Sequence, residues 1–179
     1  MIIMSKRQDY KSAGAKFQTK SALYGHVRYM LMLERVCSRF HLIARQLRSR
    51  HGNRDTLHVE DEYDVRDLLH ALLTLDYDDV RPLEWTPGYA ANARTDFLLK
   101  LEQIVVVAKK ADDSLGAGEL AEQLAVDIQK YKQHPGCRTL VCFVYDPEGR
   151  IADPREIEND LSGEKDGLTM RVIIAPKGL

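Results

Sequence analysis

The sequence has few residues that could form disulfides or bind zinc. Cysteine occurs three times, at Cys37, Cys137 and Cys142, with no paired spacing. An odd count of this kind argues against a disulfide framework and against a cysteine-based zinc site. The six histidines show no ligand spacing either. We therefore expect buried free thiols and a cytoplasmic protein, because the cytosol keeps thiols reduced.

Long apolar runs and several well-known motifs are also missing. No run approaches the ~20 apolar residues that a membrane-spanning helix needs, so no membrane partner is expected. The first charged residues are not followed by an apolar stretch, so we expect no signal peptide. Neither a glycine-rich phosphate loop nor a Ser-His-Asp or Cys-His arrangement stands out. No zinc finger or clear helix-turn-helix is available to read base sequence.

The composition is otherwise that of a globular protein, but its charge is unevenly distributed. Of the 179 residues, 44% are hydrophobic and 30% are charged, which suits one compact domain with an appended helical element. Residues 1–50 carry eleven Lys and Arg against two acids, a net +9, whereas the remainder carries 15 against 25, a net −10. Two interpretations have equal weight: the basic segment binds a polyanion, or it docks on the acidic body of its own chain or of a partner protomer.

The N-terminal third predicts a basic helical extension. Residues 1–17 are polar and lack a period, which predicts a mobile arm. From about Lys20 to Arg50 apolar residues recur every three or four positions, as on one face of a helix, with a kink near Ser38 or a pair of helices as alternatives. Residues 51–55 are typical of a linker. We therefore divide the chain into an extension, 1–55, and a domain, 56–179.

The remainder predicts an α/β fold with a mixed central sheet flanked by helices. The first helix of this part begins at about Asp61, with Tyr63, Leu68 or Leu69, and Leu72 on its inner face. The other expected elements are strands at 80–85, 95–100, 103–109, 138–145 and 169–174, and helices at 116–132 and 154–161. The strand at 103–109 is rich in β-branched residues, so we expect it to be central and buried on both faces.

Two neighbouring strands carry the residues that suggest chemistry. Asp96 lies at the start of one strand, and Lys109 ends the next. In a hairpin, the start of the first strand lies beside the end of the second. Because strand side chains alternate with period two, Val107 and Lys109 share a face. The sequence thus predicts that Asp96, Val107 and Lys109 lie together.

This arrangement resembles the PD-(D/E)XK nuclease superfamily, whose motif is an acidic residue on one strand followed by Asp or Glu, any residue, and Lys on the next. Longer stretches are similar to the restriction-endonuclease-like domains grouped with DpnII and MboI. They are EYDVRDLLH at 62–70, DVRPLEWTP at 79–87, DFLLK at 96–100 and TLVCFVYDPEG at 139–149. The resemblance covers about residues 60–176 and implies a restriction-endonuclease-like core.

The resemblance also implies roles for particular residues. Asp96 and Glu62 would be ligands of Mg²⁺ or Mn²⁺, which prefer oxygen donors. Lys109 would be the catalytic lysine, and Gln123, with Tyr131 eight residues on, would belong to a polar helix that lines the site. The expected nucleic-acid contacts are Arg94, Lys110, Arg45 and Arg48. Simpler interpretations exist. The helix dipole alone explains an acid such as Glu62 in the first turn of a helix. Gln123 could simply lie on the helix surface, and Tyr131 could simply belong to the core.

Val107 departs from the family motif, because it stands where Asp or Glu is expected and has no lone pair to offer a cation. We expect a Mg²⁺-dependent DNA endonuclease of prokaryotic defence type that is disabled at this position. The alternative is a naturally inactive nuclease-fold subunit that binds nucleic acid or supports assembly. A third hypothesis is an oligomerisation or regulatory protein with residues 20–50 as its interface. RNA is not excluded as the substrate, and we expect a homo-oligomer and a separate sensor or targeting protein.

Overall fold

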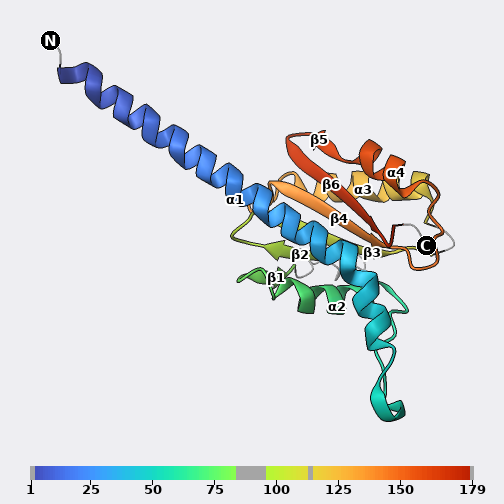
Figure 1. Cartoon of the computed structure of the whole chain (residues 1–179). Helices are drawn as coiled ribbons and strands as arrows, with labels where there is room; N and C mark the ends of the chain where they lie inside the picture. The colour runs from blue at the N-terminus through green and yellow to red at the C-terminus, as the bar shows by residue number, and fades with distance from the viewer. Residues whose placement is uncertain (1–2, 84–95, 113–114, 178–179) are drawn as a thin grey trace. The chain divides into compact units, whose positions relative to one another are not determined.

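The computed structural model describes residues 3–83, 96–112 and 115–177 (Figure 1). The chain forms two compact units, Met1–Leu33 and Glu34–Leu179. Helix α1, Ile3–Leu47, supplies the first unit and continues into the second. Residues 3–17, for which the sequence predicts a mobile arm without a period, are helical. A missing apolar period argues against a packed face, but it does not argue against a helix in a segment rich in good helix formers.

The second unit contains a mixed six-stranded sheet with the strand order β1-β2-β3-β4-β6-β5. Strands β3 and β4 pair in parallel, as do β4 and β6, whereas the pairs β1-β2, β2-β3 and β5-β6 are antiparallel. This arrangement confirms the predicted α/β class. The strand bounds are Val80–Pro82 (β1), Asp96–Leu99 (β2), Ile104–Lys110 (β3), Thr139–Tyr145 (β4), Gly163–Lys165 (β5) and Leu168–Ala175 (β6).

The sequence did not predict β5, which has three residues and no buried side chain, so it leaves no hydrophobic period to detect. Strand β4 is buried along its whole length. The neighbouring strand β3 is buried from Ile104 to Ala108. These two strands form the centre of the sheet, as their β-branched runs predict.

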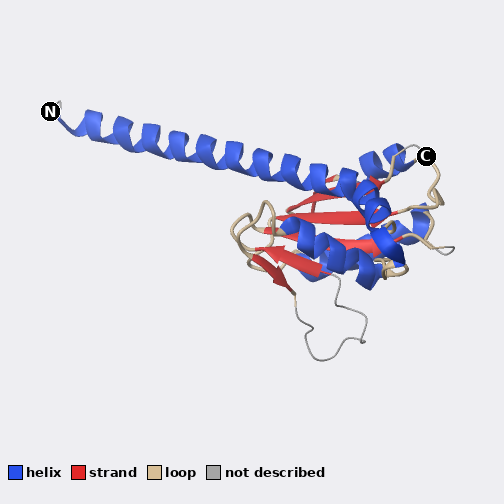
Figure 2. Ribbon diagram, turned by 60° about the horizontal axis from the view of Figure 1, so that its bottom comes forward, coloured by secondary structure: helices blue, strands red, loops and turns tan. Residues whose placement is uncertain are grey.

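Helices cover both faces of the sheet (Figure 2). They are the part of α1 that belongs to the second unit, α2 (Glu62–Leu73), α3 (Ala117–Tyr131) and α4 (Pro154–Leu161). A short 3-10 turn lies at His51–Asn53. Asp61 caps α2 by accepting hydrogen bonds from the backbone N–H groups of Tyr63 and Asp64, and Asp64 completes a capping box. The predicted inner face of α2 needs correction, because Tyr63 is exposed; the buried residues are Val65, Leu68, Leu69 and Leu73.

The two faces of the sheet are formed by alternate residues of each strand. We name the α3 face after the helix that packs on it; its apolar core combines α3 residues such as Leu120 and Leu124 with strand residues such as Val105, Val107 and Cys142. Ile157 and Leu161 of α4 pack against the same core.

On the opposite face, which we name the α2 face, His70 of α2 stacks on Phe97 at 5.0 Å between ring centroids. Phe40, in the part of α1 that belongs to the second unit, packs on Phe143 of β4 at 5.1 Å. The central sheet therefore has an apolar layer on each face.

The three cysteines are free and buried, as predicted. In the part of the chain that the structure describes, no helix combines the length and hydropathy that crossing a bilayer requires.

Candidate active site

The β2–β3 hairpin brings together the three residues that carry the motif. Asp96 pairs directly with Val107 in the antiparallel register. Directly paired residues point to the same face, and Lys109 lies two positions further along β3, so all three side chains are on the α3 face. Asp96 is 4% exposed and Val107 2%. The carboxylate is therefore buried beside the apolar side chain of Val107, the position at which the sequence resemblance led us to expect an acid.

Helix α3 supplies two partners for the Asp96 carboxylate. The Nζ atom of Lys130 lies 2.6 Å from Oδ2 of Asp96. The hydroxyl group of Tyr131 donates a hydrogen bond to the same oxygen. Burial and the neighbouring Asp96 raise the pKa of Tyr131, so the phenol keeps its proton and acts as a donor. The buried charge of Asp96 is thus paired and hydrogen-bonded, as a buried carboxylate must be.

Lys109 is paired with a second carboxylate of α3. Its Nζ atom lies 3.4 Å from Oδ2 of Asp127, and the two side chains are 12% and 15% exposed. Oδ2 of Asp127 is itself buried and has no hydrogen-bond partner. A buried carboxylate oxygen that lacks a hydrogen bond is costly. The ion pair at 3.4 Å compensates for that cost only in part.

The electrostatics of this pair favour a further positive charge. Burial acts to lower the pKa of Lys109, but the nearby carboxylates, Asp127 first among them, more than offset burial, so its pKa is raised. The pKa of Asp127 is also raised, because burial and the charge of Asp96 outweigh the attraction of Lys109 and Lys130. The ammonium group stays charged, whereas Asp127 is not fully compensated.

Glu62, the predicted helix carboxylate, lies at the first turn of α2, within electrostatic reach of this cluster. Burial raises its pKa, the Lys109 charge and the Lys110 backbone N–H oppose that rise, and the Asp112 and Asp96 charges add to it. The capping of α2 by Asp61 positions this turn. The structure therefore brings Glu62 to the end of β3 near Asp96 and Lys109.

Gln123, the predicted polar residue of α3, donates a hydrogen bond to Glu119 on its own helix at 3.5 Å. Tyr131, eight residues on, contacts Asp96 directly. The sequence interpretation missed Asp127 and Lys130. A signal was available, because Gln123, Asp127 and Tyr131 are spaced by four and share one face of the helix.

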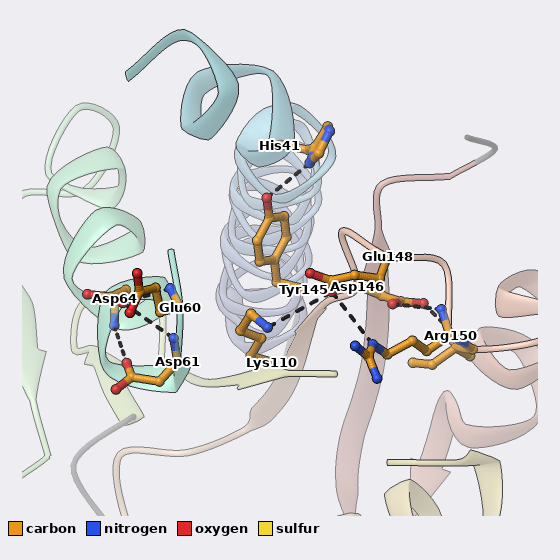
Figure 3. A network of polar contacts seen from close by, with 10 residues as sticks. His41, Glu60, Asp61, Asp64, Lys110, Tyr145, Asp146, Glu148 and Arg150 are labelled. Atoms are coloured by element: carbon orange, nitrogen blue, oxygen red, sulfur yellow. Dashed lines mark hydrogen bonds and ion pairs between the residues drawn. The ribbon is translucent and has the colours of Figure 1, made fainter. Parts of the chain in front are cut away.

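Three of the predicted nucleic-acid contacts, Lys110, Arg45 and Arg48, lie elsewhere on the second unit. Lys110 points to the α2 face, because it is adjacent to Lys109 on β3. Figure 3 shows it beside Glu148, with the two charged groups 4.0 Å apart. In the same view His41 of α1 bonds to the hydroxyl group of Tyr145 at 3.0 Å.

Burial lowers the pKa of His41, and the charges of Arg45 and Arg48 lower it further. Both arginines are therefore close to this cluster at the end of β4, and both are exposed. Arg94 lies outside the described residues.

The chemical type of the available donor atoms suits a hard divalent cation. Asp96, Asp127 and Glu62 offer carboxylate oxygens, which Mg²⁺ and Mn²⁺ prefer, and Asp127 has a buried oxygen without a hydrogen bond. Within residues 3–83, 96–112 and 115–177, no three His, Cys, Asp or Glu side chains converge into a metal-binding cluster. The Nζ atom of Lys130 lies next to a carboxylate oxygen of Asp96, and the Nζ atom of Lys109 lies next to one of Asp127.

Comparison with known proteins gives one match. The model of the DpnII-MboI restriction endonuclease family matches residues 31–177. No curated protein and no solved structure was found to match. The family match begins within α1, about 30 residues before the stretch in which the sequence alone showed the resemblance. It covers most of the chain, including the sheet, the hairpin and α3, and the chain therefore belongs to the DpnII-MboI family of restriction endonucleases.

Proposed function

We propose that the chain is a Mg²⁺- or Mn²⁺-dependent DNA endonuclease that hydrolyses phosphodiester bonds in prokaryotic defence. Membership of the restriction endonuclease family supports nuclease activity. The observation that carries the proposal is the pairing of Asp96 with position 107, with Lys109 on the same face of the hairpin. On this proposal Asp96 is one carboxylate of the family motif and Lys109 is its lysine.

Each residue then has a distinct role. Asp96 would hold the cation, with Glu62 as a further ligand at the first turn of α2. A bound divalent cation neutralises charge on the phosphate and lowers the pKa of water. Lys109 supplies a fixed positive charge toward the phosphate, because its ammonium stays protonated. Gln123 lies on the helix that covers this face and is a candidate for orienting the phosphate or the attacking water.

Val107 limits this site. It is 2% exposed and apolar, so the hairpin by itself offers the cation one carboxylate instead of two. Metal affinity depends on the number of charged ligands. If Asp96 is the only carboxylate that the hairpin supplies to the cation, we expect the enzyme to be impaired or inactive.

A restored motif tests the proposed function. Val107→Glu should produce Mg²⁺-dependent cleavage of supercoiled plasmid DNA, or raise any existing rate, because it adds an oxygen ligand directly opposite Asp96. Lys109→Met in the same background should abolish the gain, and circular dichroism checks that both variants are folded. A folded Val107→Glu variant that cleaves no DNA with either Mg²⁺ or Mn²⁺ would contradict the proposal.

A second candidate is a naturally inactive subunit that keeps the nuclease fold for nucleic-acid binding or assembly. The apolar side chain of Val107 at the motif position favours it. This candidate predicts DNA binding without cleavage, and no gain of cleavage in Val107→Glu. The plasmid assay and a gel-shift assay on the same preparations separate the two functions.

The expected partners follow from the chemistry. DNA is the proposed substrate, and an assay with single-stranded and duplex RNA tests the alternative.

Cutting both strands of a duplex at once needs two active sites, so we expect a homo-oligomer. Because no base-reading motif is evident in the sequence, a separate sensor or targeting protein would direct the enzyme, and its place of action would be the cytoplasm.

A further inference from the structure

The site contains a carboxylate that the two-strand motif does not include. Asp127 approaches Lys109 from α3, on the same face of the sheet as Asp96 and Val107. Its Oδ2 atom is buried and lacks a hydrogen bond. Tyr131, one helical turn later on α3, holds Asp96, so one face of α3 meets both motif residues.

We propose that Asp127 supplies the second carboxylate that Val107 cannot, so that Asp96 from β2 and Asp127 from α3 together hold the divalent cation. This inference rests on the proposed function, because it completes the same site. It also changes the expected consequence of Val107, since the second ligand then comes from a helix instead of from β3.

Three other acids in the described part of the chain, Asp112, Glu119 and Glu102, form no ion pair with Lys109. Oδ1 of Asp112 accepts a hydrogen bond from the backbone N–H of Leu115 at 3.1 Å, in the turn that follows β3. Glu119 is exposed on α3 and bonds to Gln123. Glu102 lies in the turn at the opposite end of the hairpin. Within the described residues, the acid that forms an ion pair with Lys109 is Asp127.

Two lysines neutralise the acids of this site. Lys130 neutralises Asp96 at 2.6 Å, and Lys109 neutralises Asp127 at 3.4 Å. Each lysine is on a different element from its acid, so the two ion pairs join α3 to the hairpin. Lys130 is 45% exposed and can move into solvent. A divalent cation would then replace its charge next to Asp96.

Metal binding tests the inference without relying on cleavage. Mn²⁺ is titrated into the full-length chain and the free Mn²⁺ is followed by its paramagnetic resonance signal. Asp127→Asn should weaken binding by about tenfold or more, as removal of a charged ligand requires, and Asp96→Asn should do the same. Glu122→Gln, an exposed change on the same helix, is the matched control and should leave the affinity unchanged.

Two further variants keep the test decisive if Asp127→Asn folds poorly. Asp127→Glu retains the carboxylate and should retain most of the affinity. In the double variant Val107→Glu/Asp127→Asn, a carboxylate on β3 takes the place of the one removed from α3, so Mn²⁺ binding should return toward the wild-type value.

The outcomes distinguish this inference from the proposed function. Wild-type affinity in Asp127→Asn, together with a loss in Asp96→Asn, would overturn the role of Asp127 and leave the proposed function standing. If neither the wild-type chain nor Val107→Glu binds Mn²⁺ or cleaves DNA, the proposed function fails and this inference fails with it. Loss in Asp127→Asn with recovery in the double variant supports both.

Discussion

Asp96 shows how much one residue of the site depends on its neighbours. It is 4% exposed, and its Oδ2 atom is held by Lys130 and by the hydroxyl group of Tyr131. A buried carboxylate without such partners would cost several kcal/mol or become protonated. The position of the carboxylate next to Val107 is therefore maintained from α3 as well as from the strand that carries it.

Removing the Tyr131 hydroxyl group should destabilise the fold. Tyr131→Phe deletes a donor to a buried carboxylate and leaves the aromatic ring in place, so we expect the free energy of unfolding to fall by about 1–2 kcal/mol. Urea denaturation measures it. Tyr63→Phe, at an exposed position on α2, is the control and should change the stability by less than about 0.5 kcal/mol. Equal stability of the two variants would show that the hydroxyl group does not hold Asp96.

At the scale of elements, the first turn of α2 connects a capping interaction to the site. Asp61 accepts hydrogen bonds from the backbone N–H groups of Tyr63 and Asp64, at 2.8 and 3.0 Å. Glu62, the first residue of this helix, approaches Lys109 and the backbone of Lys110. A cap that orders this turn therefore also orders a candidate metal ligand.

Loss of the cap should be measurable. Asp61→Ala removes both side-chain acceptors from the helix start, and we expect a loss of about 1 kcal/mol in the free energy of unfolding. Thermal and urea denaturation provide the measurement. Asp67→Ala, an exposed position on the same helix whose ion pair with Arg66 spans 3.3 Å, should have a much smaller effect. A fully stable Asp61→Ala variant would mean that packing alone orders the start of α2.

At the scale of the whole chain, the uneven charge raises the question of what the basic segment binds. Arg45 and Arg48 are exposed near the end of β4. The described ion pair between this part of α1 and the sheet involves an acid, Glu34, and a base of β6, Arg171, at 2.7 Å. In this pair the helix supplies the negative charge and the sheet the positive charge, whereas a basic helix docked on an acidic body would show the reverse. The structure of the second unit thus leaves Arg45 and Arg48 accessible to a polyanion.

The salt dependence of DNA binding tests this role. Affinity for duplex DNA should fall steeply as salt rises, because bound phosphates release counterions. The double variant Arg45→Ala/Arg48→Ala should weaken binding to all sequences alike and reduce the slope of log affinity against log salt by about two. Arg155→Ala, an exposed change on α4, is the control. An unchanged slope in the double variant would exclude these arginines from phosphate contact.

The sequence predicted the elements of the second unit well, because their signals are local. A β-branched run identified β3, and the period of two in a strand placed Val107 and Lys109 on one face. Asp96 could be set opposite Val107 because a tight turn fixes the register of a hairpin. Two segments were missed or misread because they lack an apolar pattern: β5 has three residues, and the start of α1 has no period that would reveal a helix.

What the sequence by itself determined is the sheet with its flanking helices and the hairpin of β2 and β3, since these follow from patterns within a few residues, and the family, through a resemblance that extends over about residues 60–176. What only the tertiary structure decided is which side chains from other elements complete the site. Asp127 lies 18 residues from Lys109 along the chain, and Lys130 lies 34 residues from Asp96. Their contacts arise because apolar residues of α3 pack on the sheet and fix the rotation of the helix, and no local period encodes that rotation.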